Sequence, residues 1–110
     1  MIDRELLEYA AKAAGMQHKW AMGGMYVDSQ AGIWNPLTDD GDALRLAVKL
    51  GLDVEMHGCN AMHPYACAFD CMHNIAEEVQ PDDGDPCAAT RRAIVRAAAE
   101  IGKSLENAND

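Results

Sequence analysis

Three segments of this 110-residue chain carry signals for both the start and the end of a helix. Each begins after a residue that can cap a helix, repeats apolar residues at intervals of three and four, and ends at a glycine. The predicted helices span residues 4–14, 40–50 and 87–101. The expected capping residues are Asp3, Thr38 or Asp39, and Asp85. The glycines expected to end the helices are Gly15, Gly51 and Gly102.

Between these helices the sequence favours short antiparallel strands. Residues 17–27 carry apolar and aromatic side chains around a Gly-Gly pair, which predicts two strands joined by a tight turn, and Ile33 with Trp34 is a candidate third strand. Residues 52–56 alternate apolar and acidic side chains, which is typical of a strand with one buried face and one wet face. Residues 66–79 fit either a helix or strands, and strands are favoured because the preceding strand needs a partner. The sequence therefore predicts an α+β fold with three helices packed on a small antiparallel sheet.

Length and composition are typical of one domain. A chain of 110 residues has room for one hydrophobic core, and 49% apolar residues are enough to form it. We expect a single domain over residues 1–103 and a frayed polar tail over 104–110. No apolar run approaches the roughly 20 residues that a membrane span requires, and the first residues lack the pattern of a secretory signal. We therefore expect a cytoplasmic protein that does not enter a membrane.

The negative charge of the chain is concentrated in its middle. The net charge is −9, and residues 39–85 contain eleven of the eighteen acidic residues but only two of the nine basic ones. Such a charge repels nucleic-acid phosphate and favours a basic protein partner, although an acidic surface also serves solubility alone. The sequence predicts no direct binding of nucleic acid. The residues predicted to form an acidic partner-binding surface are Asp39, Asp40, Asp42, Asp82 and Asp83.

Residues 57–73 contain six Cys or His side chains, which raises the question of a zinc site. The candidate ligands are His63, Cys67, Cys71 and His73. Their spacings fit poorly with the two close pairs that zinc sites usually use, and a buried free cysteine also packs like a small apolar residue. Zinc therefore remains an alternative, and the preferred interpretation has no cofactor.

Sequence motifs of common enzymes are absent from the chain. We find no G-x-S-x-G, G-x-x-x-x-G-K, G-x-G-x-x-G or H-E-x-x-H pattern. Cys59 near His57 and His63 is the only candidate for a cysteine nucleophile with a histidine partner. We therefore predict a protein that is not an enzyme and name no catalytic residue.

Three arginines in the last predicted helix suggest a second hypothesis for the function. Together with aromatic side chains they form a candidate set for binding the phosphate and base of a nucleotide: Arg91, Arg92, Arg96, Trp20, Trp34 and Tyr26. The simpler interpretation is that these arginines pair with acidic residues or flank the second helix.

Two long motifs resemble a known family. Residues 34–50, WNPLTDDGDALRLAVKL, and residues 85–102, DPCAATRRAIVRAAAEIG, look like a family of small proteins encoded by bacteriophages and prophages of proteobacteria. The opening Asp3-Arg4-Glu5-Leu6-Leu7 resembles it too, so the likeness covers roughly half of the chain. It is more faintly similar to small phage α-β-α sandwich domains. The segment 57–73 matches no pattern of this family.

The resemblance implies a biological setting. Small phage accessory proteins often bind a host protein, and those that inhibit bacterial immunity, including CRISPR complexes, are commonly acidic because they cover a basic nucleic-acid channel. The resemblance thus predicts an inhibitor that binds a bacterial host protein or complex. The alternative is a protein that sequesters a nucleotide signal, and such proteins are usually homo-oligomers.

Overall fold

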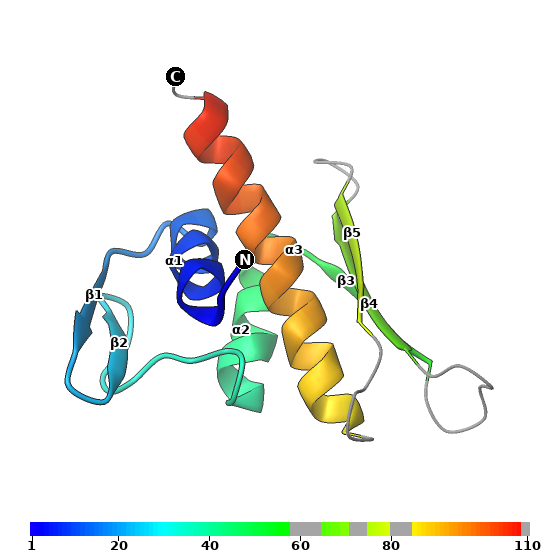
Figure 1. Ribbon diagram of the computed structural model, residues 1–110, viewed down its shortest axis with the longest axis horizontal. Coiled ribbons are helices and arrows are strands. Elements are labelled where there is room, and N and C mark those ends of the chain that lie inside the picture. The colour runs from blue at the N-terminus through cyan, green and yellow to red at the C-terminus, as the bar shows by residue number, and fades with distance from the viewer. Residues whose placement is uncertain (58–64, 71–74, 80–84, 109–110) are drawn as a thin grey trace.

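The computed structural model describes residues 1–57, 65–70, 75–79 and 85–108. These residues form three helices and two small antiparallel sheets, which is the α+β fold class that the sequence predicts (Figure 1). In chain order the elements are α1 (Asp3–Ala13), β1 (His18–Ala21), β2 (Gly24–Val27), α2 (Asp40–Leu50), β3 (Asp53–His57), β4 (Tyr65–Asp70), β5 (Ile75–Val79) and α3 (Pro86–Ala108).

Helix α3 lies in the middle of the molecule. The helices α1 and α2 pack against one side of it, and the sheet of β3, β4 and β5 packs against the other (Figure 1). Because both sides are covered, five small residues in the middle of α3 are completely buried: Ala93, Val95, Ala97, Ala98 and Ala99. Arg96, which lies among them in the sequence, is exposed. Small side chains let both neighbouring layers approach the helix closely. Within the described residues, no helix is long and apolar enough to cross a bilayer.

The sequence predicted that the last helix ends at Gly102, and this prediction was wrong. The helix continues to Ala108, so it includes residues 104–108 of the segment predicted to be a frayed tail. Gly102 is buried, and a Cβ atom at this position would overlap the backbone carbonyl of Tyr9 in α1. The glycine is required because α1 and α3 approach closely there.

Both limits of α2 and the end of α1 follow the signals in the sequence. Helix α2 starts after Asp39, whose carboxylate accepts a hydrogen bond of 2.8 Å from the N–H of Asp42, and it ends at Gly51 with φ of 66°. Helix α1 ends at Ala13, and Gly15, whose φ is 71°, follows the C-cap residue Ala14. Asp3, however, is not the cap of α1. Ile2 occupies that position and makes no capping bond from its side chain, so this prediction was wrong.

The strands form two sheets rather than one. Strands β1 and β2 are the predicted hairpin, but Ile33 makes only a single bridge to Tyr26 instead of a third strand. The second sheet has the order β3-β4-β5 with antiparallel pairing throughout, so the prediction of strands is confirmed for residues 66–70 and 75–79, the part of 66–79 that the structure describes.

The three-stranded sheet has one face against α3 and one face open. On β4 the side chains of Ala66, Ala68 and Asp70 are buried, whereas the alternating Cys67 and Phe69 are half-buried on the opposite face. The apolar side of β3 joins the core only in part. Met56 at its end is 71% exposed, in contrast to the expectation for residues 52–56.

Candidate functional site

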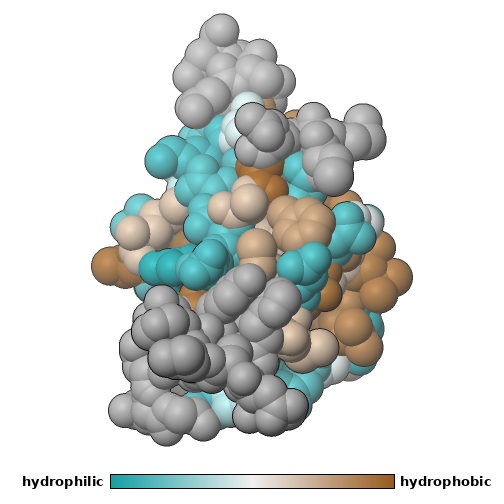
Figure 2. Space-filling view, turned by 90° about the vertical axis from the view of Figure 1, so that its right-hand side faces the viewer, coloured by the Kyte–Doolittle hydropathy of each residue, from teal (hydrophilic) through white to brown (hydrophobic). Residues whose placement is uncertain are grey.

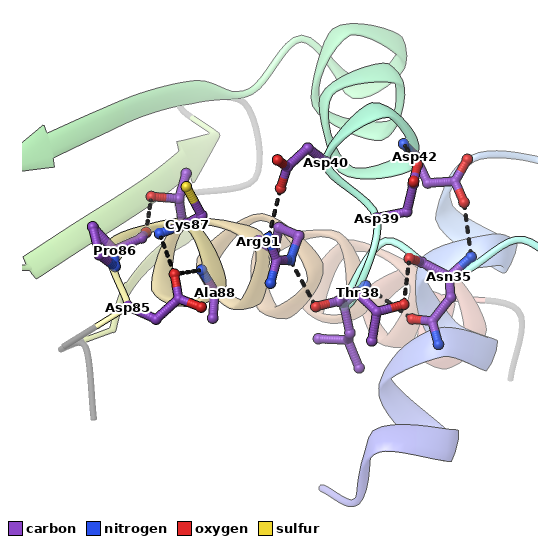
Figure 3. Close-up of polar contacts among 12 residues, drawn as sticks. Asn35, Thr38, Asp39, Asp40, Asp42, Asp85, Pro86, Cys87, Ala88 and Arg91 are labelled. Atoms are coloured by element: carbon purple, nitrogen blue, oxygen red, sulfur yellow. Dashed lines mark hydrogen bonds and ion pairs between the residues drawn. The ribbon is translucent and has the colours of Figure 1, made fainter. Parts of the chain in front are cut away.

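The three aspartates at the start of α2 are engaged in contacts that hold the fold (Figure 3). The carboxylate of Asp42 is buried, accepting a hydrogen bond of 2.9 Å from the N–H of Asn35 and one of 2.7 Å from Nη2 of Arg45. Asp39 caps the helix, as described above. Asp40 forms an ion pair with Arg91.

These contacts change the predicted acidic surface. Asp42 is only 3% exposed, so it does not belong to any surface that a partner can reach, in contrast to the prediction. Asp39 and Asp40 are exposed, but their carboxylates already have partners. Asp82 and Asp83 lie outside the described residues.

Two arginines of α3 connect this helix to the segment before α2 and to the start of α1. Arg91 donates from Nε to the carbonyl of Leu37 at 2.9 Å and pairs through Nη1 with Asp40 (Figure 3). Arg92 pairs with Asp3 at the start of α1, with 3.1 Å between Nη1 and Oδ1. Helix α3 therefore contacts both of the other segments through its arginines, and these polar contacts stabilise the helical half of the molecule.

Most of the residues predicted to bind a nucleotide are buried or already contact other residues of the protein. Trp34 is 3% exposed, so its ring is not available to stack on a base. Arg4 lies 4.5 Å from the centre of the Trp20 ring, and the hydroxyl of Tyr26 donates to the carbonyl of Met22 at 3.5 Å. Arg91 and Arg92 have the partners just described. Arg96 is exposed and lies close enough to Glu77 to oppose the rise of its pKa.

The open face of the three-stranded sheet gathers exposed carboxylates. The register places Glu55 of β3 and Glu78 of β5 on either side of Cys67, and it places Asp53 beside Phe69. All three carboxylates are exposed, and the two β4 residues between them are half-buried. Within the described residues no helix covers this face (Figure 1), and the space-filling view of the same side shows hydrophilic and apolar residues next to one another (Figure 2). We call these five residues the acidic sheet face.

The electrostatic field of this face acts on Cys67. Burial raises the pKa of its thiol above the ordinary value of 9.0. Three neighbouring carboxylates raise this pKa further: Glu55, Glu78 and Glu77. A thiol in this setting stays protonated at neutral pH, whereas zinc binding and nucleophilic attack both require the thiolate.

The zinc alternative gains no support from the described residues. Cys67 is the only candidate ligand among them, since His63, Cys71 and His73 all lie outside, as does Cys59. In the described part of the chain no three Cys, His, Asp or Glu side chains form a group that could hold a metal ion.

The acidic sheet face contains acidic residues that the sequence analysis did not select. The alternation in residues 52–56 indicated a wet acidic face on one strand, and this was the signal that could have led to Asp53 and Glu55.

Comparisons with family models, with curated proteins and with solved structures find no match for this chain. The described geometry suits binding of a basic and partly apolar surface, because carboxylates lie next to a half-buried aromatic ring and a protonated thiol.

Proposed function

We propose that the protein is a non-catalytic inhibitor that binds a bacterial host protein through the acidic sheet face. The observation that carries this proposal is the pairing register, which places exposed Glu55 and Glu78 on either side of Cys67 and exposed Asp53 beside Phe69, on a face that no described helix covers. Protein interfaces commonly have an apolar centre and a polar rim, and this face has that arrangement on a small scale.

The charge of the chain supports a basic partner. Its net charge of −9 attracts a positively charged surface over a distance of about 10 Å at moderate salt, and this attraction increases the rate of association. Proteins that handle nucleic acid have such surfaces, because they neutralise phosphates with lysine and arginine. Covering that surface excludes the nucleic acid, so the target that we propose is a nucleic-acid-handling protein, such as a defence complex. The resemblance to phage and prophage proteins is in line with this role.

The proposal is tested by capture from the lysate of a proteobacterial host, followed by affinity measurements with the purified target. Asp53→Lys combined with Glu78→Lys reverses two charges on the acidic sheet face. Glu5→Lys combined with Glu106→Lys is the matched control, since it makes the same change in net charge on α1 and the end of α3. We expect the wild type and the control to bind one host protein and the sheet-face variant to lose it.

Two further results are expected if the target is a nucleic-acid-handling protein. Its affinity for the wild type falls as salt is raised, with a weaker salt dependence for the sheet-face variant. The wild type also reduces binding of nucleic acid by the target. A target that binds the sheet-face variant as tightly as the wild type would overturn the proposed role of this face.

A further inference from the structure

A cavity of about 530 Å³ lies where the C-terminal end of α1, the loop of residues 28–34 and α2 meet. Its volume falls within the range of about 300–1,000 Å³ that is typical of small-molecule sites. Its apolar lining includes three residues that are at most 5% exposed: Ala14, Trp34 and Leu46. Ser29 and Gln30 contribute polar groups from the loop. The cavity lining thus combines buried apolar residues with polar groups from the loop.

The charged residues of this cavity are both cations. Arg45 and Lys49 line it from successive turns of α2, and they are the only two basic residues between positions 39 and 85. No acidic residue is among the described residues that line it. In a chain with a net charge of −9, the lining of this cavity contains two cations and no carboxylate, and Asp42 and Asp39 next to Arg45 balance the charge of that residue, which leaves Lys49 as the cation without an acidic partner among the described residues.

The two cations differ in how they are held. Nη2 of Arg45 donates to the buried carboxylate of Asp42 at 2.7 Å and lies 3.9 Å from the carboxylate of Asp39, and a guanidinium has more N–H donors than these contacts use. Lys49 is exposed and makes no hydrogen bond or ion pair with any other residue that the structure describes. Lys49 is therefore free to pair with a ligand.

We propose that this cavity binds a small organic anion, whose apolar part lies on Trp34 and Leu46 and whose anionic group pairs with Lys49 and Arg45. The site is separate from the acidic sheet face, because α3 stands between the α1–α2 layer and the sheet (Figure 1). Its ligand has the opposite charge to the proposed protein partner. The two proposals can therefore fail independently.

The test is a titration followed by amide signals in nuclear magnetic resonance spectra of the isotopically labelled protein. Three probes share one apolar body and differ in charge: 3-phenylpropionate, the neutral 3-phenylpropanamide and the cationic 3-phenylpropylammonium. We expect 3-phenylpropionate to shift the signals of cavity residues, including Ala31, Leu46 and Lys49, in a saturable way. The neutral probe should bind about tenfold more weakly because it loses the charged pairing, and the cation more weakly still.

Two pairs of variants separate the role of Lys49 from general effects of charge. Lys49→Gln and Lys49→Glu should weaken binding of 3-phenylpropionate about tenfold or more, as expected for loss of a charge-assisted contact. Lys103→Gln and Lys103→Glu make the same changes at an exposed position of α3 outside the cavity lining and should leave binding unchanged. The unliganded spectra of these variants report whether the fold is retained.

Three results would overturn the proposal. The first is the lack of any saturable shift with 3-phenylpropionate up to about 10 mM, a concentration that detects even weak sites. The second is equal binding of the anionic and neutral probes. The third is unchanged binding in a folded Lys49 variant.

Discussion

Arg91 joins the start of α2 to α3 through two groups at once. Its Nε donates to the carbonyl of Leu37 at 2.9 Å, and its Nη1 pairs with the carboxylate of Asp40. The arginine side chain is only 17% exposed, whereas that of Asp40 is 74% exposed. The backbone contact is therefore better shielded from water than the ion pair, and we expect it to contribute more to stability.

This difference predicts unequal effects of removing the two partners. Arg91→Ala leaves the Leu37 carbonyl without its hydrogen bond and should lower the free energy of unfolding by about 2 kcal/mol. Asp40→Ala removes only the exposed ion pair and should cost less than about 1 kcal/mol. Urea unfolding followed by circular dichroism measures both. Equal losses in the two variants would show that the ion pair, and not the backbone contact, dominates.

The close approach of α1 and α3 predicts a strong effect of one added methyl group. Gly102→Ala places a Cβ atom into the backbone carbonyl of Tyr9, so the helices must separate, and we expect a loss of about 2 kcal/mol. Lys103→Ala is the control, because it changes an exposed neighbour on the same helix. Thermal unfolding measures the stability of both variants. A Gly102→Ala variant that is as stable as the control would contradict this account.

The buried carboxylate of Asp42 should matter more than the capping carboxylate of Asp39. Asp42→Ala leaves the N–H of Asn35 and the guanidinium of Arg45 without their acceptor, which predicts a loss of about 2 kcal/mol. Asp39→Ala removes one capping bond together with an exposed ion pair of 3.9 Å to Arg45, which adds little, and should cost about 1 kcal/mol. Asp39→Ser keeps a capping oxygen, so its stability should remain close to that of the wild type. A serine variant as unstable as the alanine variant would argue against the capping role.

The carboxyl group of Glu77 predicts a pH dependence of stability. Burial and then the neighbouring Glu100 raise its pKa above the ordinary value of 4.5, and Arg96 opposes this rise. A raised pKa in the folded state means that the ionised carboxylate disfavours folding at neutral pH. This penalty is relieved as pH falls through the folded-state pKa. Glu77→Gln should therefore stabilise the protein at pH 7, with a gain that shrinks towards acidic pH.

The matched control for this prediction is Glu78→Gln. Glu78 is the next residue on β5, but it lies on the open face, where its side chain is exposed. Chemical denaturation at several pH values compares the two variants with the wild type. A gain from Glu77→Gln that is constant between pH 7 and about pH 4 would contradict the assignment to ionisation of this carboxyl.

Local signals in the sequence were enough to place most elements. Asp39 and Gly51 set the limits of α2 because capping depends on neighbouring residues alone. Gly102 was misinterpreted because a helix-ending glycine and a glycine at a close helix contact look the same in sequence. The contact with Tyr9 depends on tertiary packing across the whole chain. Asp3 was misinterpreted for a similar reason, since its partner Arg92 is 89 positions away.

The candidate sites show the same division between local and distant information. The alternation of residues 52–56 predicted a wet acidic face, but the sequence does not reveal that Glu55 and Glu78 flank Cys67, because this depends on strand register. Asp42 looked like a typical exposed acid in the first turn of a helix, and only the packing of the Asn35 segment and Arg45 shows that it is buried. The cavity lined by Lys49 forms between three segments and leaves no motif.

The complete burial of the small residues in the middle of α3 links the two sides of the molecule energetically. A helix whose central alanines have no exposed surface depends on both the α1–α2 layer and the sheet, so neither layer can detach while the other remains stable. The domain should therefore unfold in one cooperative transition. A partner bound on the sheet would then raise the melting temperature of the distant helices as well, and a ligand between α1 and α2 would protect the strands.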